Sequence, residues 1–145
     1  MPRIRLELPK EFDFSTQIQV RITDINYGGH VGNDKILTII HEARIQFLKS
    51  FGYTEMQFEG TSLIMSDVAI EFKNELFFGD DLKVFVTTTD FSKVAFDIYY
   101  KLIKNNKGQE VIIAIAKTGM VCYNYDVKKV SSVPEKAINK LKSLS

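Results

Sequence analysis

The sequence predicts an α+β fold in which an antiparallel sheet packs against one long helix. One helix-like segment, residues 35–51, stands near the start of the chain, and one strand-like segment precedes it. Four strand-like segments follow the helix with only short connections between them. Strands that follow one another through short turns pair antiparallel, so we expect a single sheet that covers the helix.

Chain length and composition favour a single domain spanning residues 1–145. A chain of 145 residues can bury a sizeable core, but it is too short for two ordinary domains. The hydrophobic fraction of 45% and the charged fraction of 26% are normal for a soluble globular protein. The net charge of +1 provides no broad basic surface, so neither nucleic acid nor a membrane is expected as a partner.

The N-terminal sequence and the cysteine content indicate a cytoplasmic protein. The first residues, MPRIRLELPKEF, lack the apolar stretch of a signal peptide, and the run VIIAIA (111–116) is too short to span a bilayer. Cys122 is the one cysteine, which excludes an intramolecular disulfide. Its surroundings, MVCY, are typical of a small buried strand residue and not of a nucleophile.

The strand-like segments are recognised by alternating polarity or by β-branched and aromatic residues. Gly119 is a place where the last and longest of them can bend. The segment DFSK fits a hairpin turn between two strands, and NNKG is a strong turn signal. A last short helix is expected after Pro134. The predicted strands are residues 16–23, 62–73, 82–89, 94–104 and 110–124.

The helix-like segment 35–51 has an unusually wide apolar face. Its apolar residues fill about half of the helix circumference, which suits burial against a sheet. Arg44 falls inside that face, between Leu37 and Ile40. Two interpretations stay open for it. Either its aliphatic stem packs while the guanidinium reaches an edge, or the guanidinium pairs with a carboxylate.

The segment TDINYGGHVGND (23–34), between the first strand and the helix, is rich in glycine and polar residues. Gly28 and Gly29 allow a positive φ and a close approach by another group. Asn33 is expected as the N-cap of the helix, and Asp34 suits the positive end of the helix dipole. The simplest interpretation of these residues is a well-built loop.

The same segment also has the parts that hydrolysis or acyl transfer needs. Free amides at a helix N-terminus polarise a carbonyl oxygen that gains negative charge. Asp24, Asn26 and His30 stand next to them and can hold water or move a proton. On residue types alone the loop interpretation remains the favoured one.

The segment VRITDINYGGHVGNDKILTIIHEARIQFL closely resembles the signature of hotdog-fold acyl-CoA thioesterases of the 4-hydroxybenzoyl-CoA thioesterase type. Asp24 matches the first aspartate of the family's aspartate-x-aspartate element. A weaker match, IEFKNELFFGDDLKV (70–84), resembles the strand, turn and strand start found later in that family. The matching loop and helix residues are Gly29, His30, Val31, Asn33, Glu42, Ala43 and Arg44.

The resemblance implies a hotdog fold, in which about five antiparallel strands wrap around the long helix. It implies a homodimer or homotetramer whose active sites lie at the dimer interface. It implies hydrolysis of an acyl-CoA thioester with a small or medium acyl group, although a carrier-protein thioester remains open as the substrate. No cofactor is expected, and two histidines with one cysteine do not make a metal-ligand set.

The sequence departs from the family pattern at one position. The second aspartate of the family, its nucleophile or general base, is Asn26 here, and an amide cannot accept a proton from water at neutral pH. We expect Asp24, Asn26 and His30 to carry the catalysis, with Glu42 on the helix as a further candidate acid. The alternative is a protein that binds acyl thioesters and hydrolyses them poorly.

The substrate-binding residues expected from the resemblance are Tyr27, Gly29, Val31 and Asn33. Three further apolar residues, Ile36, Ile64 and Phe72, join Tyr27 as candidates for lining an acyl pocket. Each of these four has the plainer interpretation of a core residue, which we favour. The identity of the acyl group does not follow from the strand pattern.

Overall fold

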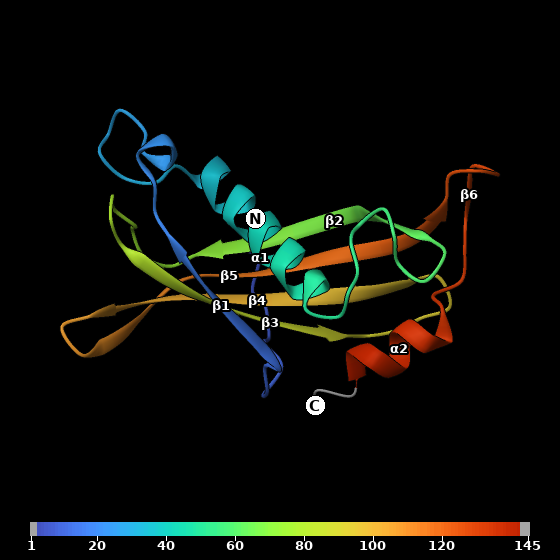
Figure 1. Ribbon diagram of the computed structural model, residues 1–145. Coiled ribbons are helices and arrows are strands. Elements are labelled where there is room, and N and C mark those ends of the chain that lie inside the picture. Colours follow the sequence, from blue (N-terminus) through green and yellow to red (C-terminus); the bar gives the residue numbers. More distant parts are fainter. Residues whose placement is uncertain (1–2, 143–145) are drawn as a thin grey trace.

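The computed structural model describes residues 3–142. It shows a six-stranded antiparallel sheet with a long helix against one face (Figure 1). The α+β hotdog prediction is confirmed, and the sixth strand is only a two-residue addition that pairs with β5. The strand order is β1-β3-β4-β5-β2, so β1 and β2 are the edges. The elements are β1 (Phe14–Gln19), the 3-10 helix η1 (Ile22–Asp24), α1 (Asn33–Lys49), β2 (Ser62–Phe72), β3 (Asp81–Thr89), β4 (Ala95–Asn106), β5 (Gln109–Asn124), β6 (Lys129–Val130) and α2 (Glu135–Lys142).

Helix α1 lies across one face of the sheet and contributes six buried residues to the hydrophobic core (Figure 1). The apolar face predicted for it is buried, including Ile40, Ala43 and Leu48, which have no exposed surface. Facing residues of the sheet, such as Ile98 and Ala116, are equally buried because alternate strand residues point to the helix side. The helix begins and ends two residues earlier than the predicted 35–51.

The first strand ends earlier than its alternation predicts. Pairing with β3 runs from Phe14 to Gln19, and residues 22–24 then turn in a 3-10 helix. The backbone amide of Arg21 donates to Asp24 Oδ2 at 2.9 Å, which closes this turn. The predicted strand 16–23 was therefore wrong at its end, because a local side-chain cap competes with extended pairing there.

The turn predicted at NNKG joins β4 to β5. Lys107 and Gly108 both have a positive φ, 53° and 85°, and Asn106 pairs with Gln109 across them. Two central residues with positive φ match the right-handed twist of the flanking strands. The hairpin predicted across DFSK is also present, since β3 pairs antiparallel with β4 on either side of it.

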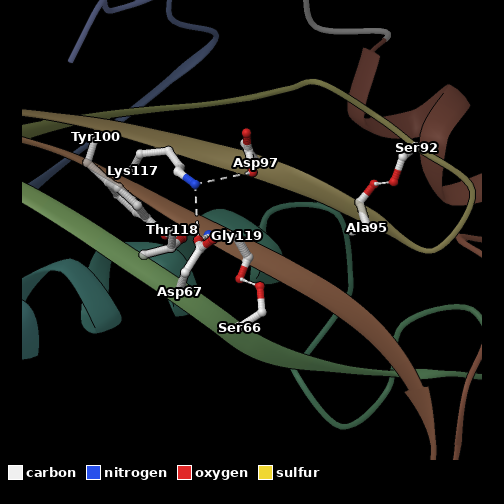
Figure 2. Close-up of polar contacts among 9 residues, drawn as sticks. All are labelled: Ser66, Asp67, Ser92, Ala95, Asp97, Tyr100, Lys117, Thr118 and Gly119. Carbon is white, nitrogen blue, oxygen red and sulfur yellow. Dashed lines mark hydrogen bonds and ion pairs between the residues drawn. The ribbon is translucent and has the colours of Figure 1, made fainter. Parts of the chain in front are cut away.

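Gly119 has a different role from the predicted bend. The irregularity lies in the neighbouring strand β2, where the register shifts between Met65 and Asp67. Figure 2 shows the Asp67 carboxylate turned across β5, where its Oδ1 accepts hydrogen bonds from Gly119 N at 2.9 Å and Lys117 Nζ at 3.0 Å. A Cβ on Gly119 would lie 2.4 Å from that oxygen, so only glycine leaves room for this contact.

The N-terminal segment covers part of the sheet face that points away from α1. Leu6 N donates to Glu71 Oε2 on β2 at 3.3 Å, and Phe12 packs edge-on against Phe85 on β3. The segment thus crosses the sheet before β1 begins. Strand β2 keeps one unpaired edge within residues 3–142, and Val68 and Phe72 on it are partly exposed.

Candidate active site

The loop between η1 and α1 is shaped by Asn26. Its backbone makes two hydrogen bonds within the loop. Asn26 N donates to His30 O and Gly29 N donates to Asn26 O, both at 3.0 Å. Its side-chain oxygen accepts from Gly28 N at 2.9 Å and from His30 N at 3.4 Å. Gly29 has a φ of 86°, which glycine adopts without strain. The oxygen of Asn26 is therefore occupied by the loop itself.

The start of α1 leaves two backbone amides and one side chain available. Gly32 is the N-cap and offers no side chain, so the prediction of Asn33 as N-cap was wrong. Lys35 N and Ile36 N make the first intrahelical bonds, both to Gly32 O. The amides of Asn33 and Asp34 precede those bonds, and such amides attract negative charge. Since Asn33 does not cap the helix, its side chain is free to face a ligand.

A cavity of about 270 Å³ opens beside the start of α1. One wall comes from the loop and the helix, and the other comes from the end of β2, the segment after it and β5. The cavity therefore joins the polar loop to apolar side chains of the core. Its lining residues are His30, Val31, Asn33, Ile36, Phe72, Lys73, Asn74, Glu75, Leu76 and Ile113.

His30 lines this cavity, and its ring is held through one nitrogen. Its Nδ1 lies 3.1 Å from the backbone oxygen of Val31. A carbonyl oxygen only accepts hydrogen bonds, so the neutral ring must carry its hydrogen on Nδ1. The lone pair then resides on Nε2, which makes no hydrogen bond to any residue of 3–142. An imidazole held in this tautomer is suited to take a proton from water.

Asp24 and Glu42 lie together in a separate niche. Asp24 is 3% exposed, and its carboxylate is engaged by Arg21, whose backbone amide and guanidinium lie 2.9 Å and 3.6 Å away. Glu42 is exposed and accepts from Gln46 Nε2 at 3.4 Å. Both acids border a niche of only about 20 Å³, which His30 and Asn33 do not line. The structure thus divides the expected catalytic residues into two groups.

Three of the four apolar candidates are not core residues. Tyr27 is fully exposed and does not line the cavity, and Ile64 is 36% exposed on β2. Phe72 is 48% exposed and lines the cavity together with the buried Ile36. The core interpretation was therefore wrong for Tyr27, Ile64 and Phe72. Alternation cannot distinguish a core residue from one at an open edge.

Arg44 pairs with a carboxylate inside the protein, which confirms the second interpretation of its position. It is 4% exposed, and its Nε donates to Glu55 Oε2 at 3.0 Å. Its Nη1 donates to the hydroxyl of Tyr100 at 3.3 Å, and that hydroxyl lies 2.7 Å from Thr118 Oγ1 (Figure 2 shows the last two residues). Burial raises the pKa of Tyr100, so its hydroxyl stays neutral. Glu55 stands in a loop, where no sequence pattern marked it.

Metal and membrane features can be judged for the part of the chain that the structure describes. Among residues 3–142, no group of three histidine, cysteine, aspartate or glutamate side chains is arranged to hold a metal ion. Within the same range, neither helix combines the length and apolar character that crossing a bilayer requires.

Comparison with known proteins relates this site to thioester hydrolysis. Residues 20–141 match the model of the thioesterase-like superfamily. A 1,4-dihydroxy-2-naphthoyl-CoA hydrolase of Microcystis aeruginosa is 29% identical over 119 residues, which cover 80% of this chain and 83% of that protein. The superfamily match takes in the whole loop and α1.

Solved structures show the same architecture. A 1,4-dihydroxy-2-naphthoyl-CoA thioesterase from Synechocystis aligns with a TM-score of 0.80 and 25% identity, over 90% of this chain and 96% of that one. A 4-hydroxybenzoyl-CoA thioesterase mutant complexed with 4-hydroxybenzoyl-CoA aligns with a TM-score of 0.81 at 14% identity, over 88% and 97%. These matches confirm the expected hotdog thioesterase, and the chain belongs to the thioesterase-like superfamily.

Proposed function

We propose that this protein hydrolyses acyl-CoA thioesters to the free acid and CoA in the cavity beside the start of α1. One observation carries the proposal. His30, whose Nε2 has no hydrogen-bond partner among residues 3–142, and Asn33, the first residue of α1, line the same small cavity. A proton acceptor beside an oxyanion site is the minimum that thioester hydrolysis needs.

The residues have separate tasks in the proposed reaction. The amide of Asn33, which lines the cavity, receives the thioester carbonyl oxygen and stabilises the negative charge that it gains. His30 Nε2 takes a proton from water as the water oxygen bonds to the carbonyl carbon. When the carbon–sulfur bond breaks, that proton passes to the sulfur, so the products are a carboxylic acid and the CoA thiol.

Asp24 and Asn26 act in this proposal through the loop. Asn26 holds the amides of Gly28 and His30 and thereby sets where the imidazole lies. Asp24 closes the turn at Arg21 that leads into the loop. Glu42 has no task in the reaction, because it borders the other niche.

The cavity fits a small or medium acyl group and favours an aromatic one. Ile36, Leu76 and Ile113 provide an apolar floor, and the partly exposed ring of Phe72 stands at the side. Aromatic rings prefer offset or edge-on contact with one another, which an aryl thioester would gain here. Two of the similar proteins are named for 1,4-dihydroxy-2-naphthoyl-CoA, which has this character.

The proposal includes a homodimer that forms through β2, or a tetramer built from two such dimers. Strand β2 is a long edge with unpaired backbone groups and exposed Ile64, Met65, Val68 and Phe72. Such an edge invites pairing with a second copy. We place the protein in the cytoplasm, where a free thiol such as Cys122 stays reduced.

A thiol-release assay with a panel of aromatic and aliphatic acyl-CoA thioesters tests the function. Multiple turnovers on at least one aryl-CoA or medium-chain acyl-CoA are expected. The second candidate, an acyl-thioester binding protein, is favoured by the absence of a carboxylate at Asn26. Tight binding of a non-hydrolysable analogue without turnover of any panel member would support that candidate and contradict hydrolysis.

A further inference from the structure

A second cavity lies where the N-terminal segment crosses the end of β2. Its volume is about 660 Å³, more than twice that of the cavity beside His30. It is bordered by the N-terminal segment on one side and by the end of β2 with one residue of β5 on the other. The lining residues are Arg3, Ile4, Arg5, Leu6, Ile70, Glu71, Phe72, Lys73 and Ile115.

This cavity carries an excess of positive charge. Its lining includes three cationic side chains, those of Arg3, Arg5 and Lys73, and one carboxylate, that of Glu71. Glu71 is already engaged, because its Oε2 accepts from Leu6 N at 3.3 Å and lies 3.8 Å from Lys73 Nζ. Neither Arg3 nor Arg5 makes an ion pair within residues 3–142. Two guanidinium groups without an anionic partner thus stand at the same cavity.

The two cavities meet at the end of β2. Phe72 and Lys73 line both of them. A ligand whose reactive end lies beside His30 can therefore continue past Phe72 and place a charged end against Arg3 and Arg5. Guanidinium groups bind phosphate through paired hydrogen bonds, and Ile4 and Ile70 offer apolar surface beside them. The two adjoining cavities suit an elongated ligand that has an acyl group at one end and phosphate at the other.

We propose that this second cavity binds the phosphates at the nucleotide end of CoA through Arg3, Arg5 and Lys73. The proposal rests on the proposed function and deepens it, because it selects CoA thioesters over carrier-protein thioesters. CoA carries a diphosphate and a 3′-phosphate beyond its pantetheine arm, which matches a cavity with several cations. A carrier-protein thioester has a single phosphodiester followed by a protein surface.

Kinetics with a truncated substrate tests this inference. The preferred acyl group is presented on CoA and on pantetheine, which has the same reactive end and no phosphates. The double variant Arg3→Gln/Arg5→Gln is compared with Lys128→Gln/Lys129→Gln. The control removes two exposed cations at the turn and start of β6, which pairs near the opposite end of β5.

For the Arg3→Gln/Arg5→Gln variant, KM for acyl-CoA should rise by about tenfold or more, as expected for lost charge-assisted hydrogen bonds, while kcat changes little. Its KM for acyl-pantetheine should equal that of the wild type, and the control variant should match the wild type on both substrates. Unchanged KM for acyl-CoA, or an equal rise for both substrates, would overturn the inference and leave the proposed function standing. A wild-type preference for acyl-carrier-protein over acyl-CoA would overturn it as well.

The inference can be judged even if no hydrolysis occurs. Calorimetric titration with free CoA measures binding by the wild type and by the double variant. Weaker binding of CoA by Arg3→Gln/Arg5→Gln alone supports the phosphate site, and equal binding by all three proteins overturns it. Failure of the proposed function, which appears as absent turnover of both thioesters, is thereby separated from failure of the phosphate site.

Discussion

Arg44 Nε donates a hydrogen bond to Glu55 Oε2 at 3.0 Å, and this pair joins the middle of α1 to the loop before β2. The backbone of Glu55 is itself tied to β2, because its oxygen accepts from Leu63 N at 2.7 Å. The second carboxylate oxygen of Glu55 lies 2.8 Å from His41 Nε2. The helix that carries the site is thus fixed against the strand proposed as the dimer edge.

Replacement of Arg44 by leucine should destabilise the fold. Arg44→Leu leaves the Tyr100 hydroxyl and one oxygen of Glu55 with fewer partners, at a cost of about 1–3 kcal/mol in the free energy of unfolding. Chemical denaturation monitored by circular dichroism measures the change. Lys49→Leu, at an exposed position on the same helix, should change stability by about 0.5 kcal/mol or less. Equal unfolding curves for Arg44→Leu and the wild type would contradict the importance of the pair.

The thiol of Cys122 should be unreactive in the native protein. Cys122 has no exposed surface, and burial raises its pKa to about 11. Almost no thiolate is present at pH 8, and the reagent cannot reach the sulfur. Ellman's reagent should therefore label the protein only after denaturation. Stoichiometric labelling of the native protein at pH 8 would show that the β5 core opens readily.

The elements of the fold could be predicted because hydrophobic period and turn residues act locally. The apolar face of α1 and the NNKG turn are such signals, and both were correct. The end of β1 was missed because the hydrogen bond from Arg21 N to Asp24 replaces strand pairing. The sequence pattern predicts a strand up to residue 23. It does not reveal that the carboxylate of the next residue, Asp24, closes a turn.

The site could be predicted only in part, because its residues come together through tertiary structure. His30, Val31 and Asn33 were expected from one loop, and they share one cavity. The other wall, including Phe72 and Lys73, comes from a strand far along the chain. Which of the polar loop residues face the cavity depends on two local features. These are the hydrogen bond that the Asn26 side chain accepts within the loop and the position of Gly32 as N-cap of α1, and residue types do not reveal either of them.

Conversion of Asn26 to aspartate should raise the catalytic rate. One carboxylate oxygen can still accept from Gly28 N and His30 N, so the loop should persist. The other takes the place of the side-chain nitrogen, which stands 3.7 Å from where a Cβ on Gly32 would be, near the start of α1. Helix amides favour an ionised group there. We expect kcat of Asn26→Asp to rise by about tenfold, or about 1.4 kcal/mol of barrier.

A matched control separates charge at the site from charge in general. Asn124→Asp makes the same change at a turn where Oδ1 accepts from Asp126 N at 2.9 Å, and its kcat should equal that of the wild type. A lower kcat for Asn26→Asp with unchanged thermal stability would show instead that the amide of Asn26 has its own task in the reaction.

The protein should sediment as a dimer or tetramer. Strand β2 offers an unpaired edge with exposed apolar side chains, so pairing buries both. Val68→Lys places a charge on that edge and should shift the protein toward monomer in analytical ultracentrifugation. Val127→Lys, at a 59% exposed position between β5 and β6, should leave the assembly unchanged. A wild-type protein that is monomeric at micromolar concentration would contradict pairing through β2.

The most direct test of the account is the turnover of the preferred acyl-CoA by His30→Gln. The variant loses the lone pair of Nε2, and kcat should fall by about 10²–10⁴ while the Kd of a non-hydrolysable thioether analogue stays the same. His41→Gln changes the other histidine, which is exposed and bound to Glu55, and should keep wild-type kcat. Wild-type kcat for His30→Gln would contradict the assignment of His30 as the base that activates water.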